Sequence, residues 1–530
     1  MGIYLNPGCE GFEEIRRDIY VDKSGLISFM NSLIGKPKPL VSFSRPRRFG
    51  KTYDTHMLTA YYDKSCDSRS LFSGLEIAGD DSFETHLNKY NVISIDVTTC
   101  ISASKDTGRD VLEELKYSVL KEVRETFPEC TREDESNLGK ALCDVVSAGN
   151  AKFVFIIDEW DAIFREYKKD TQLQKDYILF LRGLFKSKDV TPKVVAAAYM
   201  TGILPIKKYG TESALTDFKE YSMTAPKRLA KYVGFTEDEV KQLCNEHQMD
   251  FDEMKAWYDG YSFSRIKHVY SPNSVMSALQ EEEISNYWTQ TETFESLKEY
   301  IEMDYDGLKD AVTTMLGGER VNVKTSTFQN DITSFKNKND VLTLLIHLGY
   351  LAYDSVKREV YIPNLEVADA FEDAVSGEKW GVVGEALSAS ERLLDATLEE
   401  DADVVASALE QIHSSVSSVL NYNNEASLSC AITIAYYTAQ RYYSIVRELP
   451  SGKGFADLAF FPRKGTDKPA MIIELKYDQD ADTAIRQIHE NRYEGDLKEH
   501  FGNLLLVGIN YDKEAKGENA KRHSCVIERV

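Results

Sequence analysis

Two carboxylates and a lysine near the end of the chain have residue types and spacing that suit phosphodiester hydrolysis. Asp457 falls within the apolar strand candidate 454–461, and Glu474 and Lys476 end the next one, 470–476. Because side chains alternate along a strand, Glu474 and Lys476 share one face. Carboxylate oxygens suit Mg²⁺ or Mn²⁺, and a bound divalent cation activates water. We expect Asp457 and Glu474 to hold the cation and Lys476 to orient the water; the alternative is an ordinary cross-strand ion pair.

Two further residues are candidates for the same site. Glu425 opens the predicted helix 426–443, where it would be a further metal ligand or a charge that stabilises the helix N-terminus. Gln487 falls on the predicted helix 481–493. It would contact the metal-bound water or the scissile phosphate, or it would be an exposed helix residue. Both alternatives stay open for each side chain.

A second chemical pattern lies in the segment Arg45-Pro-Arg-Arg-Phe-Gly-Lys-Thr52, which joins an apolar strand to a helical pattern. Its end has the form of a Walker A loop. In such a loop Gly50 lets the backbone approach phosphate, Lys51 reaches the β- and γ-phosphates, and the Thr52 hydroxyl ligates Mg²⁺. Backbone amides at the helix N-terminus complete the anion site. Arg45 departs from the general motif, because it stands where the first glycine belongs.

The apolar strand candidate 153–158 ends in the paired acids Asp158 and Glu159. This is the form of a Walker B segment, in which Asp158 holds Mg²⁺ and Glu159 polarises the attacking water. A strand that simply ends in solvated acids is the alternative. Doubly wound sheets bind ligands at the carboxyl ends of their strands. Since both motifs lie at strand ends, together they predict an ATP site.

Three other residues are candidates for contacts with the nucleotide. Arg47 and Arg48 would clamp phosphate oxygens, or they would be surface charges. Thr201 ends the strand candidate 193–201 and would sense the γ-phosphate, or it would only form a turn.

The elements that must position these residues fall into three regions. Region 1–285 alternates strands and helices, which predicts an α/β fold with a parallel, doubly wound sheet. Region 286–390 reads as mostly helical, with a short strand pair at 351–353 and 359–362. Region 391–530 reads as a small α/β domain: the helix 426–443, strands 445–449, 454–461 and 470–476, the helix 481–493 and a strand at 503–509.

Composition narrows the class of protein. With 42 % hydrophobic and 28 % charged residues the chain is globular, and no apolar run reaches the roughly 18 residues of a membrane span. No secretory signal is visible, so we expect a cytoplasmic protein with reduced cysteines. The formal net charge of −23 argues against a chain that coats nucleic acid non-specifically.

The chain resembles bacterial AAA-ATPase-like proteins joined to a C-terminal PD-(D/E)XK nuclease superfamily domain. The resemblance runs in order along nearly the whole chain and is carried by Tyr20–Lys23, Arg45–Lys51, Ile157–Glu159 with Asp161, Trp257–Tyr261, Ser271–Val275, Leu348–Leu351, Tyr361–Asn364, Gly454–Asp457 and Glu474–Lys476. These relatives also have an arginine at the position of Arg45. The segment Gly454-Phe-Ala-Asp457 lacks an arginine that they often have, and Thr52 replaces a serine.

The resemblance implies a P-loop ATPase domain with a helical subdomain, followed by a metal-dependent nuclease domain. We expect an ATP-binding, ATP-hydrolysing protein that regulates cleavage of DNA, with ATP and Mg²⁺ or Mn²⁺ as cofactors. The alternative is a signalling or interaction protein whose nuclease-like domain binds nucleic acid or a partner without cleavage. A P-loop that binds nucleotide without turnover is a third reading. The sequence leaves a homo-oligomeric state open.

Overall fold

The structure is a computed structural model of the whole chain. It describes residues 2–131, 135–206, 215–288, 293–303, 305–330, 332, 334–417, 425–451, 454–491, 502–513, 515 and 522–530. The chain divides into two compact units. The first comprises residues 1–254, 258–283 and 322–360, and the second comprises 255–257, 284–321 and 361–530. Each unit is described by itself.

The first unit is built on a five-stranded parallel sheet with strand order β2-β3-β4-β1-β5. The strands are β1 (Leu40–Ser44), β2 (Asn91–Asp96), β3 (Phe153–Asp158), β4 (Val195–Gly202) and β5 (Lys219–Tyr221). Strands β1, β3 and β4 are buried throughout, as their apolar runs require. Strand β1 lies between β4 and β5, with Leu40 opposite Ala198 and Ser44 opposite Gly202.

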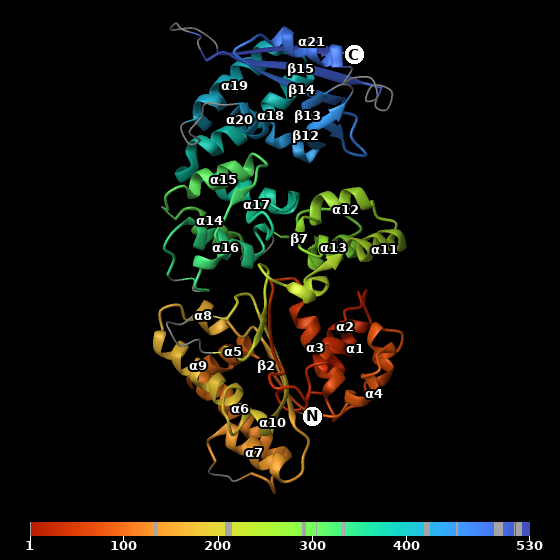
Figure 1. Cartoon of the computed structure of the whole chain (residues 1–530), viewed down its shortest axis with the longest axis vertical. Coiled ribbons are helices and arrows are strands. Elements are labelled where there is room, and N and C mark those ends of the chain that lie inside the picture. Colours follow the sequence, from red (N-terminus) through yellow and green to blue (C-terminus); the bar gives the residue numbers. More distant parts are fainter. Residues whose placement is uncertain are drawn as a thin grey trace. The chain divides into compact units, whose positions relative to one another are not determined.

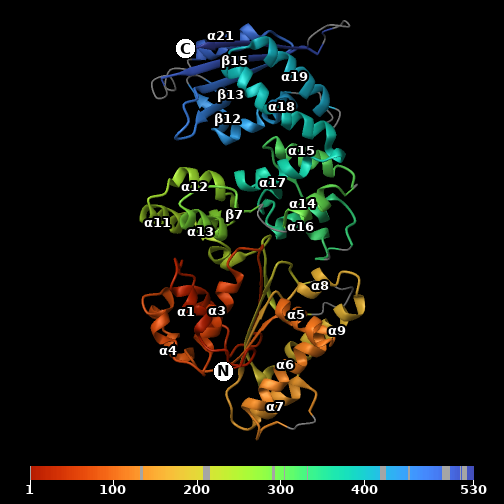
Figure 2. The ribbon, with the colours of Figure 1, turned by 180° about the vertical axis from the view of Figure 1, so that it is seen from behind.

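Helices cover both faces of this sheet, so the predicted doubly wound α/β fold is confirmed (Figures 1 and 2). One group comprises α1 (Glu10–Arg16), α2 (Gly25–Asn31), α3 (Lys51–Tyr62) and α4 (Phe83–His86). The other includes α5 (Val97–Thr107), α6 (Val111–Thr126), α7 (Leu138–Ser147), α8 (Ala162–Glu166), α9 (Thr171–Phe185) and α10 (Thr191–Val194). A continuous core joins the second group to β2, β3 and β4.

A small helical subdomain follows the sheet in the chain. It contains β6 (Phe235–Thr236), α11 (Glu237–His247), α12 (Phe251–Tyr258), β7 (Tyr261–Phe263), β8 (Ile266–Tyr270) and α13 (Pro272–Glu281). A capping box of Thr236 and Glu239 starts α11. The unit also includes α16 (Lys338–Leu348) and β10 (Ala352–Asp354), and the Tyr261 hydroxyl donates to the Gly349 carbonyl at 2.6 Å.

The second unit combines helices with a five-stranded mixed sheet of order β12-β13-β14-β15-β16. The strands are β12 (Tyr443–Ser451), β13 (Gly454–Pro462), β14 (Ala470–Tyr477), β15 (Leu504–Tyr511) and β16 (His523–Arg529). Strands β14 and β15 are parallel and the other pairs are antiparallel. The helices include α14 (Thr293–Ile301), α15 (Leu308–Leu316), α17 (Leu365–Val375), α18 (Gly381–Leu398), α19 (Ala402–Ser417), α20 (Glu425–Ala435) and α21 (Ala481–Asn491).

The two faces of this sheet have different neighbours. On one face Ala470 and Ile472 pack with Ile485 and Ile488 of α21. On the other, the ring of Phe460 contacts the rings of Tyr436 and Tyr443. Glu474 therefore shares the α21 face with Ile472, since alternate residues of a strand lie on the same side.

The structure corrects the predicted helix 426–443. Helix α20 ends at Ala435, a 3₁₀ helix spans Tyr437–Arg441, and Tyr443 already pairs with Pro462 in the sheet. The reason is tertiary: the Tyr436 ring is fully buried and its hydroxyl lies 2.8 Å from the Thr397 hydroxyl. The end of the predicted helix 481–493 lies partly outside the described residues.

Two other differences concern a missed strand and a predicted domain boundary. Strand β16 is absent from the predicted elements; it is a half-exposed edge strand and carries no strong apolar alternation. The predicted boundary at residue 390 falls inside α18, and residues 286–390 contribute to both units. The division into 1–285, 286–390 and 391–530 stays a prediction.

Candidate functional site

The loop between β1 and α3 has the backbone that a phosphate-binding loop needs. Gly50 caps α3 in the left-handed region (φ 72°), and Arg48 also has a positive φ of 68°. A Cβ at Gly50 would meet nothing within 4 Å, so the glycine is favoured there by its φ and not by space. The loop turns directly into the N-terminus of α3, whose first-turn amides have no helical partners.

Arg45, in the place of the first motif glycine, anchors this loop. Its side chain is 2 % exposed, and Nη2 lies 2.6 Å from Asp54 Oδ2, one turn into α3. Nη1 donates to the Tyr232 carbonyl at 2.7 Å, and the guanidinium lies over the Phe43 ring. Arg45 therefore links the start of the loop to helix α3 and to the segment around Tyr232. This contact is a structural reason for the departure from the general motif.

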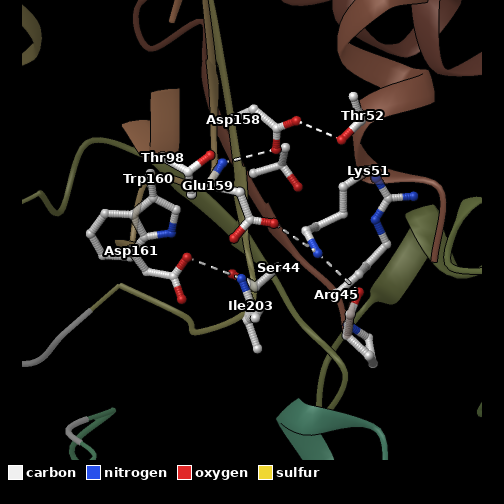
Figure 3. A network of polar contacts seen from close by, with 12 residues as sticks. Ser44, Arg45, Lys51, Thr52, Thr98, Asp158, Glu159, Trp160, Asp161 and Ile203 are labelled. Carbon is white, nitrogen blue, oxygen red and sulfur yellow. Dashed lines mark hydrogen bonds and ion pairs between the residues drawn. The ribbon is translucent and has the colours of Figure 1, made fainter. Parts of the chain in front are cut away.

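The predicted Walker A and Walker B residues meet at one place (Figure 3). Thr52 Oγ1 donates to Asp158 Oδ2 at 2.9 Å. Lys51 Nζ lies 3.3 Å from Glu159 Oε1 and donates to the Pro46 carbonyl at 3.0 Å. These contacts place a hydroxyl, an ammonium and two carboxylates around the loop, which is the donor set for a nucleotide with its cation.

Burial and neighbouring charges set the protonation of this cluster. Burial, with the adjacent Glu159 charge, raises the pKa of Asp158 to about 6. Burial lowers the pKa of Lys51. For Glu159, burial would raise the pKa, but the cations Lys51 and Arg165 outweigh it and hold the pKa below its ordinary value. Glu159 is therefore ionised at neutral pH.

Arg165 is a residue of this site that sequence reasoning missed. It forms ion pairs with Glu159 and, at 3.2 Å, with Asp161. Asp161 in turn accepts hydrogen bonds from the amides of Ile203 and Leu204, at 3.2 and 2.9 Å. The available signal was the spacing of Asp161 and Arg165, four residues apart at the start of a helix.

A cavity of about 490 Å³ opens beside these side chains. Arg47, Arg48, Gly50, Lys51 and Thr52 line one part of it, with Glu159 and Arg165. Its remaining wall comes from three other segments and is largely apolar and aromatic: Ile19, Tyr20, Val21, Tyr232, Phe235, Pro272 and Met276. A cavity with charged and apolar parts suits a ligand that is both anionic and aromatic.

Thr201 lies apart from this cavity's lining. Its side chain is buried, and its hydroxyl donates to the Phe43 carbonyl at 2.8 Å between β4 and β1. In this structure Thr201 therefore links two strands, which differs from the turn considered as the alternative, and its contact with the γ-phosphate stays a prediction.

In the second unit, Glu474 is the centre of a polar cluster. Its side chain is 2 % exposed; Oε1 lies 3.0 Å from Lys476 Nζ and also accepts from Gln487 Nε2. Asp457 Oδ2 accepts from the Leu475 amide at 2.7 Å. Burial, and next the Asp457 charge, raise the pKa of Glu474 to about 7. The structure thus brings together four of the five residues predicted for this site.

The fifth, Glu425, is the first residue of α20. Its side chain lies outside the described residues, so its role as a metal ligand stays a prediction.

The donor set at Glu474 fits a divalent cation. The second oxygen, Oε2, is buried and has no hydrogen-bond partner among the described residues. Asp457 brings a second carboxylate close enough to raise the Glu474 pKa. Within the described parts of the chain, no group of three or more His, Cys, Asp or Glu that could hold a metal is assembled. A cation held here would therefore complete its shell with water or phosphate oxygens, as Mg²⁺ commonly does.

Two family models match the parts of the chain that contain the two sites. The family model described as predicted AAA-ATPase matches residues 7–211, and that of the PD-(D/E)XK nuclease superfamily matches residues 423–519. The chain thus contains an AAA-ATPase-like domain and, C-terminal to it, a PD-(D/E)XK nuclease superfamily domain.

Two individual proteins are also similar. The "Uncharacterized protein in vnfD 5'region" of Azotobacter chroococcum mcd 1 is 26 % identical over 389 residues, covering 70 % of this chain and 69 % of that protein. The structure of the Aeropyrum pernix ORC2 protein (ADPNP-ADP complexes) matches over 68 % of this chain and 97 % of its own, with 10 % identity and a TM-score of 0.31. Among the described helices, none combines the length and the apolar character of a membrane span.

Proposed function

We propose that the protein binds and hydrolyses ATP in its first unit and thereby regulates a metal-dependent nuclease site, in its second unit, that cleaves DNA. The observation that carries the nuclease part is the buried carboxylate of Glu474, which has a lysine and a glutamine on one oxygen and no described partner on the other. A carboxylate so placed is suited to a cation, because a buried oxygen without a hydrogen-bond partner is costly.

In the nucleotide site, Thr52 and Asp158 would hold Mg²⁺ and Lys51 would contact the terminal phosphates. Arg47 and Arg48 line the same cavity and would bind phosphate oxygens. Glu159 is ionised and would orient the attacking water. The apolar and aromatic wall offers a surface for the base. A phosphate that takes Lys51 from Glu159 would leave that carboxylate available to the water.

In the nuclease site, Asp457 and Glu474 would hold Mg²⁺ or Mn²⁺, which supplies charge stabilisation and an acidified water when bound. Lys476 holds its ammonium against Glu474 Oε1 and would stabilise the negative charge that develops at the attacked phosphate. Gln487 would position a water or a phosphate oxygen through its amide. The assignment to DNA, a cytoplasmic location and a homo-oligomeric state belong to this proposal.

Two assays on the full chain test the two parts separately. Mg²⁺- or Mn²⁺-dependent cleavage of linear and circular DNA is compared between the unaltered protein and Glu474→Gln, with Glu490→Gln, an exposed residue of α21, as the matched control. Phosphate release is compared between Lys51→Ala and Glu125→Gln, an exposed residue of α6. If Glu474→Gln cleaves as the control does, the nuclease assignment is wrong.

A second function is favoured by one observation, the formal net charge of −23, which opposes binding to a polyanion. In that case the second unit is an interaction domain, and the protein is a nucleotide-dependent switch. Nucleotide binding that depends on Lys51, together with no cleavage under Mg²⁺ or Mn²⁺, would support this function over the first.

A further inference from the structure

A separate cavity of about 490 Å³ lies in the second unit and has no role in either proposed site. Tyr443, Ile445 and Arg447 line it from β12, and Asn364 lines it from the start of α17. Tyr443 and Arg447 pair with Pro462 and Leu458 of β13.

This cavity lies on the face of the sheet that α21 does not cover. Leu458 pairs with Ile473 of β14, and paired residues of neighbouring strands lie on the same face. Ile473 is next to Glu474 in the strand, so the two point to opposite faces. Arg447 therefore lies on the opposite face from the Glu474 carboxylate.

The lining of this cavity is positively charged, whereas the chain as a whole is strongly negative. Arg447 and Arg463 line the cavity, and none of its described lining residues is an aspartate or a glutamate, although the whole chain has a formal net charge of −23. Arg447 is held in place by Glu319, by the Gly317 carbonyl and by Thr433 Oγ1. Arg463 Nε donates to the Gln440 carbonyl at 3.2 Å. Glu319 already balances part of the charge of Arg447, but the two guanidinium groups fixed at one cavity still offer donors to an anion.

Two uncharged donors in the same lining are buried and have no hydrogen-bond partner among the described residues: Tyr443 Oη and Asn364 Nδ2. Tyr443 is fully buried. The side-chain oxygen of Asn364, in contrast, has a partner: it accepts from the backbone N–H of Val367 at 3.0 Å and caps α17. Buried donors without partners are rare in folded proteins, so both are suited to a ligand that brings acceptors.

The rest of the lining has an apolar part, which includes Met315, Leu316, Ile362, Pro363, Leu365 and Ile445, and a polar part made of Thr433, Tyr437, Gln440 and Ser444. The volume lies within the range of about 300–1,000 Å³ that is usual for small-molecule sites. We propose that this cavity binds a small organic anion of mononucleotide size, with its phosphate or carboxylate at Arg447 and Arg463 and its flat body against the apolar wall. The proposal gives a role to the Tyr361-Ile-Pro-Asn364 segment and is independent of DNA cleavage.

Binding is measured by isothermal titration calorimetry with the full chain carrying Lys51→Ala and Glu474→Ala, in EDTA, so that neither other site contributes. The probes are dAMP and TMP, with inorganic phosphate and deoxyadenosine as the separate halves of the ligand. We expect at least one mononucleotide to bind with one site per chain, and each half alone to bind at least tenfold more weakly. Equal binding of phosphate alone would overturn the role of the apolar wall.

Three variants in the same background test the residues. Asn364→Asp keeps the oxygen that caps α17 but replaces the amide donor with a negative charge, so we expect binding to be lost without a lower Tm. Tyr443→Phe removes only the unpartnered hydroxyl and should weaken binding about tenfold, while Arg486→Gln, an exposed arginine of α21, should change nothing. The proposal is overturned if no mononucleotide binds, or if Asn364→Asp and Tyr443→Phe both bind as the background does.

Discussion

Lys51 Nζ and Glu159 Oε1 lie 3.3 Å apart, so the lysine of the phosphate-binding loop forms an ion pair with the acid that follows β3. Both side chains line the same cavity. A nucleotide phosphate at this position would compete with Glu159 for the ammonium. Under the proposed function, the pair would couple the arrival of phosphate to the release of the carboxylate that would orient water.

Glu159→Gln should separate binding of nucleotide from its hydrolysis. The amide keeps the shape but cannot polarise water, so phosphate release should fall by about 10²–10⁴-fold. Affinity for ATP should stay the same or rise, because Lys51 loses its internal counter-charge. Fluorescent-nucleotide titration and phosphate release measure the two effects, with Glu125→Gln as the control. Unchanged turnover would remove Glu159 from the mechanism.

Replacing Arg45 should destabilise the first unit even when the new residue is the glycine of the general motif. Arg45→Gly leaves Asp54 buried without its counter-charge, and breaking a buried ion pair costs about 3–5 kcal/mol. Arg45→Met together with Asp54→Leu removes both charges and should recover most of the loss. Thermal unfolding followed by circular dichroism is the measurement. A double variant as unstable as Arg45→Gly would show that the ion pair is not the cause.

Metal binding at Glu474 should depend on pH around neutrality. Its pKa is raised to about 7, so below that pH the carboxyl is protonated and must lose its proton to bind a cation. Affinity for Mn²⁺ should fall about tenfold per pH unit below 7 and level off above it. Titration of Mn²⁺ by electron paramagnetic resonance between pH 5.5 and 8.5 measures this. A flat profile, or one unaltered in Glu474→Gln, would contradict the assignment.

The same shift predicts how stability depends on pH without metal. The folded carboxyl keeps its proton up to about pH 7, whereas the ordinary pKa is 4.5. Between these values the folded state binds more protons, so this group makes stability fall as pH rises from 4.5 to 7. Added Mn²⁺ should reverse the trend at the upper end. Tm of the second unit in EDTA, compared with that of Glu474→Gln, measures the effect of this group.

Lys476→Met should have two effects with one cause. The ammonium lowers the pKa of Glu474, so its loss should shift the pH dependence of Mn²⁺ binding upward. DNA cleavage should also fall by about 10²-fold or more, because the charge beside the attacked phosphate is lost. Lys476→Arg keeps the charge and should shift the binding profile less. A loss of cleavage with no shift in the profile would place Lys476 away from Glu474 in solution.

Local patterns were sufficient to predict much of the fold. Strands β1, β3 and β14 are apolar runs that end in polar residues, and this pattern determines both their type and their ends. The contact of Thr52 with Asp158 follows from the same reasoning, because parallel strands bring their carboxyl ends to one edge. The same holds for Glu474 and Lys476, which alternation places on one face.

Features set by distant packing could not be predicted from the sequence. The end of α20 depends on the burial of Tyr436 against residues far away in the chain. The anchoring of Arg45 needs Asp54 and the Tyr232 carbonyl, and the strand contact of Thr201 is made with Phe43. Arg45 and Asp54 are close in the sequence, but the Tyr232 carbonyl and the partner strand of Thr201 are more than a hundred residues away from the side chains that they bind.

Asp161 binds the amides of Ile203 and Leu204 and also pairs with Arg165, which contacts Glu159. If ATP changes the partner of Glu159, the ion pair between Glu159 and Arg165 would therefore change as well. Through the Asp161 carboxylate, that change would reach Ile203 and Leu204, which directly follow β4. Asp161→Asn should accordingly leave nucleotide affinity nearly intact. The position of Ile203 and Leu204 should then no longer depend on whether ATP or ADP is bound.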